Sequence, residues 1–112
     1  MRIAFRIQLK PELVDEYVAR HTPVWPEMLA EIAASGRRNY SIFLDDGAVL
    51  FGYYETDDEE ASRAYLAASP IAAKWEASMA ALFAGNVGRI DQTARPLREV
   101  FNLTDQLNRE TL

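Results

Sequence analysis

One short segment of the sequence gathers most of the side chains that could do chemistry near neutral pH. Residues 17–27 contain the only histidine, His21, one of the two tryptophans and two prolines. Tyr17 and His21 are four residues apart, so in a helix they would share one face, with Cβ atoms roughly 5 to 6 Å apart. An imidazole with an ordinary pKa of about 6.5 can give or take a proton, and a phenol hydroxyl can bind or relay one. This pair could therefore perform acid and base chemistry on one small ligand.

The same spacing also has a purely structural explanation. Tyr17 can be an ordinary half-buried packing residue, and His21 can simply end a helix, where the helix dipole stabilises a positive imidazolium. Spacing alone favours this structural explanation, so a catalytic role needs support from elsewhere in the chain.

Three other aromatic side chains are candidates for binding a ligand. Trp25 and Trp75 lie at core-like positions of helical patterns, where filling space is the more usual role, but an indole can also stack on the C–H face of a sugar ring. Tyr40 stands between Asn39 and Ser41, where its hydroxyl could enter the same cleft or its ring could pack within a sheet. Sugar binding and ordinary packing both stay open for these residues.

The sequence lacks the residues that several other kinds of chemistry require. A single histidine and no cysteine rule out histidine-rich and thiolate metal centres, and there is no glycine-rich phosphate loop or nucleophile elbow. The acidic run at residues 57–60 is typical of a solvated helix start and not of a metal site. We therefore predict no metal and no cofactor, which leaves acid and base chemistry or simple binding.

The composition limits the setting and the partners of the protein. A chain of 112 residues has the length of one domain, and its net charge of -5 disfavours nucleic acid or an anionic membrane as the main partner. The absence of cysteine fits a reducing compartment. Residues 1–7 carry charges inside their apolar run, unlike the apolar segment of a secretory signal, and no stretch reaches the roughly 18 apolar residues of a membrane span. The expected location is the cytoplasm.

The pattern of apolar residues predicts alternating strands and helices. Every second side chain in residues 2–9 is apolar, which indicates a half-buried strand. Pro11 suits the first turn of a helix that should stop near His21, because Pro23 disfavours helical geometry at the preceding residue. This would place Tyr17 and His21 at the exposed end of that helix. A second helix is predicted from Trp25-Pro26 to Ser35-Gly36, with Met28, Leu29, Ile32 and Ala33 inward.

The rest of the chain continues this alternation. Strands 39–44 and 49–55 are followed by a helix from Thr56 or Asp57 to about Ser69 and by a helix from Pro70 with Ile71, Trp75, Met79 and Leu82 on one face. The last predicted elements are a surface loop 84–95, a strand 96–103 and a polar tail 104–112 that is frayed or lies on a partner.

This order of elements predicts an α+β fold of the ferredoxin-like, split β-α-β kind, with a four-stranded antiparallel sheet and helices on one face. Residues 1–103 would form the single domain. The helices leave the other face of the sheet uncovered, and several large aromatic residues of the strands must lie on it; the candidates are Phe5, Tyr40, Phe43, Phe51, Tyr53, Tyr54 and Phe101. Exposed aromatic side chains are a liability on a monomer, so we predict a homodimer that closes sheet against sheet.

Several segments of the chain resemble, in order and spacing, those of the L-rhamnose mutarotase family. Residues 21–27, His-Thr-Pro-Val-Trp-Pro-Glu, resemble its His-x-x-(Ile/Val)-Trp-Pro-Glu signature, with Tyr17 four residues ahead as in that family. The resemblance covers residues 1–103, and this first block is the specific one. The supporting blocks are residues 39–44, residues 75–79 with the family's Trp-x-x-x-Met pattern, and residues 99–103 as its closing strand.

The resemblance implies a cytoplasmic dimeric α/β barrel and an isomerase that interconverts the α and β anomers of L-rhamnose without metal or cofactor. Carried over by position, His21 matches the family's proton donor, and Tyr17, Tyr40 and Trp75 match its sugar-contacting residues. Position 76 belongs to the same predicted sugar-binding set, but Glu76 stands where members commonly have a second tryptophan. Residues 84–95 also lack the Asn-Pro-Asp-Asn-Ser-Pro type of segment that many members carry. Both differences bear on the choice of sugar more than on the reaction.

The mechanism expected from this resemblance is opening and closure of the sugar ring, assisted by one acid and one base. We expect His21 to protonate the ring oxygen, Tyr17 to orient or relay the proton, and Tyr40 to bind hydroxyls. The base stays unassigned: Glu76 qualifies only if it points inward, and a surface carboxylate is the more usual case. The alternatives are a mutarotase for another deoxy sugar such as L-fucose, a cofactor-free monooxygenase on the same fold, and a non-catalytic ligand-binding module.

Overall fold

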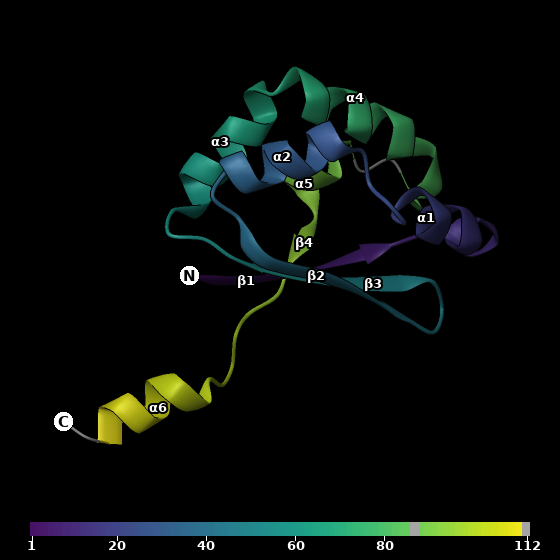
Figure 1. The fold of residues 1–112 in the computed structure, drawn as a ribbon. Helices are drawn as coiled ribbons and strands as arrows, with labels where there is room; N and C mark the ends of the chain where they lie inside the picture. Colours follow the sequence, from purple (N-terminus) through teal and green to yellow (C-terminus); the bar gives the residue numbers. More distant parts are fainter. Residues whose placement is uncertain (86–87, 111–112) are drawn as a thin grey trace.

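A four-stranded antiparallel sheet organises the molecule and carries helices against one of its faces (Figure 1). The structure is a computed structural model that describes residues 1–85 and 88–110. The strand order is β2-β3-β1-β4, and helices connect β1 to β2 and β3 to β4, which is the predicted ferredoxin-like arrangement. We call the face under the helices the inner face and the opposite one the outer face. The strands are β1 (Arg2–Gln8), β2 (Arg38–Asp45), β3 (Val49–Glu55) and β4 (Arg95–Pro96).

The inner face is apolar because side chains alternate along the two central strands. Phe5 and Ile7 of β1 are buried, as the alternation predicted, and so are Leu50 and Tyr54 of β3. Of the seven aromatic residues considered for the uncovered face, Phe5, Tyr40 and Tyr54 instead belong to the core or pack against it, and Phe101 lies outside any strand. The register places the other three on the outer face; they are Phe43, Phe51 and Tyr53.

A glycine in β3 makes room for the largest of these inner side chains. Phe5 lies opposite Gly52 in the β1–β3 ladder. A Cβ atom added to Gly52 would lie 2.0 Å from the nearest atom of the Phe5 ring, so no other residue type fits without displacing it. A strand glycine is weak in itself but allows this close approach of a ring to the backbone.

The first helix ends and the second begins at the positions predicted from the prolines. A 3-10 turn (η1, Pro11–Leu13) leads into α1 (Val14–Arg20), and α2 (Pro26–Ala34) follows the second of the two prolines. Gly36 has a φ of 91°, a left-handed conformation that glycine adopts without strain, and it ends the second helix as expected.

One prediction about the faces of these helices was wrong. Tyr17 is buried and does not lie at an exposed helix end, because the aromatic side chains around it enclose its ring. Leu29 and Ala33 face inward as predicted, because both line an open cavity between α2 and the sheet. They are nevertheless exposed, since the cavity is open to solvent.

The helices between β3 and β4 match the predicted pattern closely. They are α3 (Glu59–Ala68), α4 (Pro70–Met79) and a 3-10 turn (η2, Ala80–Leu82), with Trp75 and Met79 buried as predicted. The N-cap of α3 is Asp58, one residue later than expected, and its carboxylate accepts a hydrogen bond of 3.0 Å from the Ala61 backbone N–H.

The region after residue 84 differs most from the predictions. The predicted surface loop contains a helical turn, α5 (Ile90–Thr93); residues 86–87 of that loop lie outside the described residues. The predicted strand 96–103 was wrong, since β4 ends at Pro96. In the register that places Phe5 opposite Pro96, residue 100 would face Met1, so residues 101–103 would have no partner in β1. The chain instead leaves the sheet and forms α6 (Leu103–Glu110), which replaces the predicted frayed tail (Figure 1).

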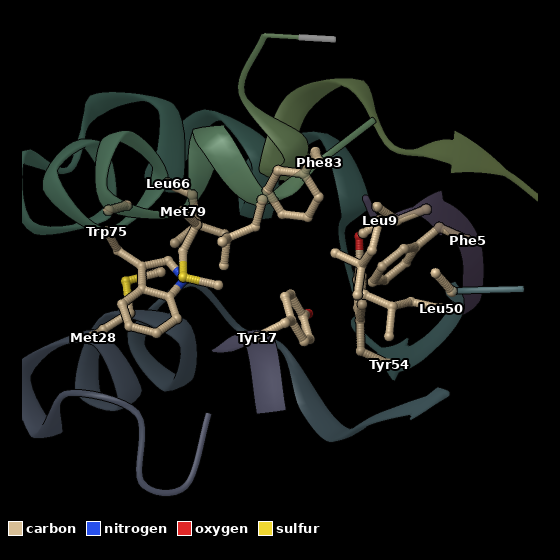
Figure 2. Close-up of a cluster of buried hydrophobic side chains, with 14 residues drawn as sticks. Phe5, Leu9, Tyr17, Met28, Leu50, Tyr54, Leu66, Trp75, Met79 and Phe83 are labelled. Atoms are coloured by element: carbon tan, nitrogen blue, oxygen red, sulfur yellow. The ribbon is translucent and has the colours of Figure 1, made fainter. Parts of the chain in front are cut away.

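The buried side chains form one core in the layer between the sheet and the helices (Figure 2). Leu50 and Tyr54 lie on the sheet side of this core, Met28 and Trp75 lie on the helix side, and Tyr17 lies between the two groups. No helix within residues 1–85 and 88–110 is long and apolar enough to cross a membrane.

Candidate active site

An open cavity of about 550 Å³ lies between the inner face of the sheet and the helices. This volume is in the range of pockets that bind small molecules. Side chains from all four strands and from five helices line it, and all five predicted site residues are among them; these are Tyr17, His21, Tyr40, Trp75 and Glu76. The structure therefore brings together residues that are up to 59 positions apart in the sequence.

Tyr17 and His21 form a stacked pair on one wall of this cavity. Their ring centroids are 4.0 Å apart with an angle of 24° between the rings. The pair is stacked because α1 places the two residues one turn apart on the same face. Burial raises the pKa of the Tyr17 hydroxyl, with smaller contributions from Tyr40 and Glu76, so this phenol stays protonated at neutral pH and can donate a hydrogen bond.

One hydrogen bond decides which nitrogen of His21 can meet a ligand. His21 Nδ1 lies 2.8 Å from the backbone carbonyl oxygen of Tyr17. A carbonyl only accepts hydrogen bonds, so Nδ1 must carry the proton, and Nε2 holds the lone pair in the neutral imidazole. Burial lowers the pKa of His21, while the bond to the Tyr17 carbonyl acts in the opposite direction. The neutral form with a basic Nε2 therefore predominates at pH 7.

Two tryptophans hold the imidazole from the helix side. The His21 ring meets the Trp75 ring edge to face at 5.3 Å, and Trp75 meets Trp25 in the same way at 5.0 Å. Trp25 is the residue before α2, so the proline that starts this helix also fixes the position of the indole. Trp75 packs in the core and also lines the cavity, so its position is compatible with both of the roles considered for it.

Tyr40 reaches the cavity from the edge strand β2, next to an irregularity in the sheet. The register shifts between Arg38 and Ser41, and Asn39 has a positive φ of 50°, so an extra residue is accommodated there. Tyr40 packs on Tyr54 at 5.1 Å and edge-on to Phe5 at 6.2 Å between ring centroids. Burial raises its pKa to about 12, although the Arg37 guanidinium acts to lower it.

Glu76 points inward, contrary to the usual case for a helical carboxylate. It is only 9% exposed, and its two oxygens accept hydrogen bonds from the backbone N–H groups of Ile90 (3.0 Å) and Asp91 (3.2 Å) at the start of α5. Burial raises its pKa to about 7, and the nearby Asp91 carboxylate adds to this effect, whereas the two hydrogen bonds and Arg89 oppose it. The helical turn in the predicted loop is thus tied to the site.

Sequence reasoning missed several polar groups of the cavity, among them Arg37 and Asp91. Arg37 is buried, stacks its guanidinium 4.1 Å from the centre of the Tyr54 ring, and donates a hydrogen bond of 2.8 Å to the Ser62 hydroxyl. Asp91 comes from the segment that was read as a surface loop. Nothing in the local sequence around Arg37 or Asp91 signals this role, because both reach the cavity through contacts with distant elements.

The arrangement supplies acid, base and hydrogen-bonding groups around a largely apolar cavity. The groups that exchange protons near neutral pH are His21 and Glu76, and the neutral phenols of Tyr17 and Tyr40 can hold hydroxyl groups. Within the part of the chain that the structure describes, no three histidine, aspartate or glutamate side chains are grouped so that they could hold a metal ion.

Comparison with known proteins identifies the relatives of this chain. The sequence family described as L-rhamnose mutarotase matches residues 2–103. An L-rhamnose mutarotase from Sinorhizobium fredii is 35% identical over 105 residues, which covers 92% of this chain and 98% of that protein. One from Acidiphilium cryptum is 39% identical over 104 residues, covering 91% of this chain and 97% of its own length.

A solved structure agrees with these matches. The crystal structure of an L-rhamnose mutarotase from Formosa agariphila superposes with a TM-score of 0.75 at 30% sequence identity. The superposition covers 92% of this chain and 98% of that one. The shared region is thus nearly the whole of both chains.

Proposed function

Because the chain belongs to the L-rhamnose mutarotase family, we propose that it is an isomerase that interconverts the α and β anomers of L-rhamnose. The observation that carries the proposal is the match over residues 2–103, which includes all five predicted site residues. The substrate is a monosaccharide, and the cavity of about 550 Å³ has room for one.

The reaction requires two proton transfers at opposite sides of the anomeric carbon. A base removes the proton of the anomeric hydroxyl, an acid protonates the ring oxygen, and the bond between the anomeric carbon and the ring oxygen breaks. After rotation of the open-chain aldehyde, closure reverses both transfers and returns both protons. Acid and base assistance of this kind contributes about 10² to 10⁴ in rate, which is enough for a reaction that already proceeds slowly in water.

His21 is the residue we assign to proton exchange with the sugar. Its Nδ1 is held by the Tyr17 carbonyl at 2.8 Å, so the exchange takes place at Nε2. The stacked Tyr17 ring keeps the imidazole in this orientation, and the hydroxyls of Tyr17 and Tyr40 bind sugar hydroxyls. Trp75 offers an aromatic surface for the apolar side of the sugar ring.

A second candidate is mutarotation of another deoxy sugar such as L-fucose. Glu76 favours it, because a carboxylate stands in the cavity where family members commonly have a tryptophan. The two sugars differ in the orientation of hydroxyl groups, and a carboxylate binds or rejects hydroxyls differently from an indole.

The experiment that tests the function is exchange spectroscopy by NMR between the anomers of L-rhamnose and, in parallel, of L-fucose. We expect wild-type protein to accelerate exchange of L-rhamnose and the His21→Ala variant to lose about 10² or more of that acceleration. A variant with the same change on the helix surface, Val18→Ala, is the matched control, because Val18 lies on the same helix and is exposed. Absence of acceleration with both sugars would refute the mutarotase activity, and a fully active His21→Ala variant would refute the role of His21. Saturable sugar binding without exchange would point to a binding module, and turnover of an aromatic substrate with oxygen to a monooxygenase.

We also propose that the protein works in the cytoplasm as a homodimer joined through the outer face of the sheet. The dimer is supported by the apolar residues of that face and of the segment beside it, of which Phe43 is 65% exposed and Phe101 61% exposed. The C-terminal helix α6, which contains the exposed residues Leu103 and Leu107, lies on the side of the sheet away from the other helices (Figure 1). A second copy would cover these surfaces.

The oligomeric state can be tested by sedimentation velocity. Phe43→Asp should convert the dimer to a monomer, because it places a charge in the proposed interface. Val18→Asp, on an exposed position of the helical layer, should leave the dimer intact. A wild-type protein that sediments as a monomer would refute the proposed dimer.

A further inference from the structure

Glu76 is a buried carboxylate that the family resemblance does not explain. It belongs to α4, is next to Trp75, and lines the same cavity as His21. Its electrostatic effect reaches the hydroxyls of both Tyr17 and Tyr40, the two phenols assigned to sugar binding. The carboxylate therefore stands among the groups that would surround a bound sugar.

The orientation of this carboxylate is held by the protein backbone. Each of its oxygens accepts one hydrogen bond from α5, at 3.0 Å from the Ile90 nitrogen and 3.2 Å from the Asp91 nitrogen. Each oxygen keeps a further lone pair, and in the neutral acid one oxygen also has a proton to donate. The start of α5 is itself held by Arg89, which pairs with the Asp91 carboxylate at 2.7 Å and donates a hydrogen bond of 3.1 Å to the Leu66 carbonyl of α3. The carboxyl group is thus preorganised in the wall of the cavity.

His21 alone cannot perform both proton transfers of the proposed reaction. Its Nδ1–H is engaged by the Tyr17 carbonyl, so at any moment the imidazole has a single nitrogen for exchange with the sugar. The hydroxyls of Tyr17 and Tyr40 are poor acids at neutral pH, because burial raises the pKa of each. Two other carboxylates line the cavity, but Glu59 accepts a hydrogen bond from the Tyr54 hydroxyl and lies 3.8 Å from Arg37, and Asp91 is paired with Arg89 at 2.7 Å. Among the described residues that line the cavity, Glu76 is therefore the carboxyl group without an ion-pair partner and the one suited to the second transfer.

We propose that Glu76 is the second catalytic residue of the reaction, the acid that protonates the ring oxygen while Nε2 of neutral His21 removes the proton of the anomeric hydroxyl. This inference rests on the proposed mutarotase function and reverses the expected role of His21 as the acid of ring opening. In the opening step the bond between the anomeric carbon and the ring oxygen breaks, the anomeric C=O forms, His21 becomes an imidazolium and Glu76 a carboxylate. Closure to the other anomer runs the same transfers backward and restores both groups.

The protonation states that this division of roles requires are those that burial favours. Burial lowers the pKa of His21 below its usual 6.5 and raises that of Glu76 to about 7, so at neutral pH the imidazole is largely neutral and much of the carboxyl group is protonated. The charged and titratable groups that act on Glu76 are Asp91 and Arg89 from the segment of α5, which act in opposite directions, and the two neutral phenols. Trp75 and Tyr17 flank His21.

The test is the pH profile of the exchange rate between the anomers of L-rhamnose, measured for the wild type and three variants. In the wild type the rate should rise with pH as His21 loses its proton and fall with pH as Glu76 loses its own, near pH 7. Glu76→Gln should lose about 10² or more in rate and lack the alkaline fall, because an amide cannot give a proton to the ring oxygen and take it back on closure. Glu76→Asp should retain the alkaline fall at a reduced rate.

A third variant separates a catalytic role from a merely structural one. Asp91→Asn keeps the backbone N–H that binds Glu76 but removes the neighbouring negative charge, so the alkaline fall should move to lower pH. Glu99→Gln, which changes an exposed carboxylate far from the cavity, is the matched control and should not move it. Glu76→Gln with the wild-type rate, or with a reduced rate and an unchanged pH profile, would overturn the proposal. A wild-type protein without any acceleration would instead refute the mutarotase function itself.

Discussion

The inner and outer faces of the sheet both carry large aromatic side chains, but these differ in how far they are exposed to solvent. Phe5 on the inner face is 7% exposed, whereas Phe43 on the outer face is 65% exposed. Both are phenylalanines within strands of the same sheet, so neither residue type nor membership of a strand separates them. The difference lies in what covers each face: helices cover the inner face, and in the part of the chain that the structure describes no helix packs on the outer face at Phe43. An aromatic residue in a strand therefore does not by itself indicate burial in the core.

Carboxylates show the same contrast more sharply. On the inner side, burial raises the pKa of Glu76 to about 7. On the outer side, the hydrogen bond from Arg2 holds the pKa of Glu99 below its usual value, and the amide of Asn39 does the same for Glu55. Solvent and hydrogen-bond donors favour the charged form outside, and desolvation favours the neutral form inside. The inner face is thus where a carboxyl group can act as an acid at neutral pH.

The largest expected effect comes from removing the same ring on each face in turn. Phe5→Ala should lower the free energy of unfolding by about 3 to 5 kcal/mol, because it leaves a void in packed core. Phe43→Ala should change the stability of the monomer by no more than ~0.5 kcal/mol, because its ring is mostly in solvent. Urea denaturation at protein concentrations below dimer formation measures both. Similar losses for the two variants would contradict the assignment of the faces.

The carboxylates should give the next largest effect, as a dependence of stability on pH. The pKa of Glu76 rises from an ordinary 4.5 to about 7 on folding, so between these pH values the folded state binds more protons than the unfolded state. Stability must then fall as pH rises through this window, by ~3 kcal/mol from this residue. Glu76→Gln should match the wild type at the acidic end and exceed its stability increasingly toward pH 8.

The control for that measurement is Glu99→Gln on the outer side. Because the pKa of Glu99 is lowered on folding, its effect on the pH dependence of stability has the opposite sign. Its contribution to the free energy of unfolding is present above its usual pKa and is lost as pH falls. Thermal or urea unfolding at several pH values measures each difference from the wild type. A Glu76→Gln difference that does not change with pH would contradict the buried, protonated state of this residue.

The smallest of the three effects concerns the fit between Phe5 and the strand beneath it. Gly52→Ala should cost roughly 1 to 3 kcal/mol, because its Cβ would lie 2.0 Å from the Phe5 ring. In the Phe5→Ala background the same change should cost much less, since the ring is gone. A double-mutant cycle by urea denaturation measures this coupling. Additive losses of stability in the double variant would show that contact with the Phe5 ring is not the reason for glycine at position 52.

Most of the fold followed from patterns within short stretches of sequence. The alternation in residues 2–9 predicted β1, the spacing around Trp75 predicted α4, and the glycine at position 36 predicted the end of α2. The region after residue 84 could not be read in this way. Residues 97–103 alternate as a strand would, but a strand needs a neighbour to pair with, and in the register of β4 the chain has no residue of β1 opposite residues 101–103.

The residues of the candidate site likewise fall into those that local sequence patterns identified and those that they did not. Residue types and spacing singled out Tyr17 and His21, and similarity of segments added Tyr40 and Trp75, all of which line the cavity. The inward orientation of Glu76 had no local signal, because it depends on backbone groups of α5 that are 14 and 15 residues away.

By itself, the sequence determined what depends on near neighbours in the chain. A helical turn places Tyr17 and His21 on one face, and an extended backbone sends alternate residues of β1 to opposite faces, whatever surrounds them. Only the tertiary structure decided that Gly52 lies under Phe5 and that Glu76 is buried against α5. The physical reason is that burial and hydrogen bonding, which set the protonation states of the site, are properties of the packed environment and not of the residue.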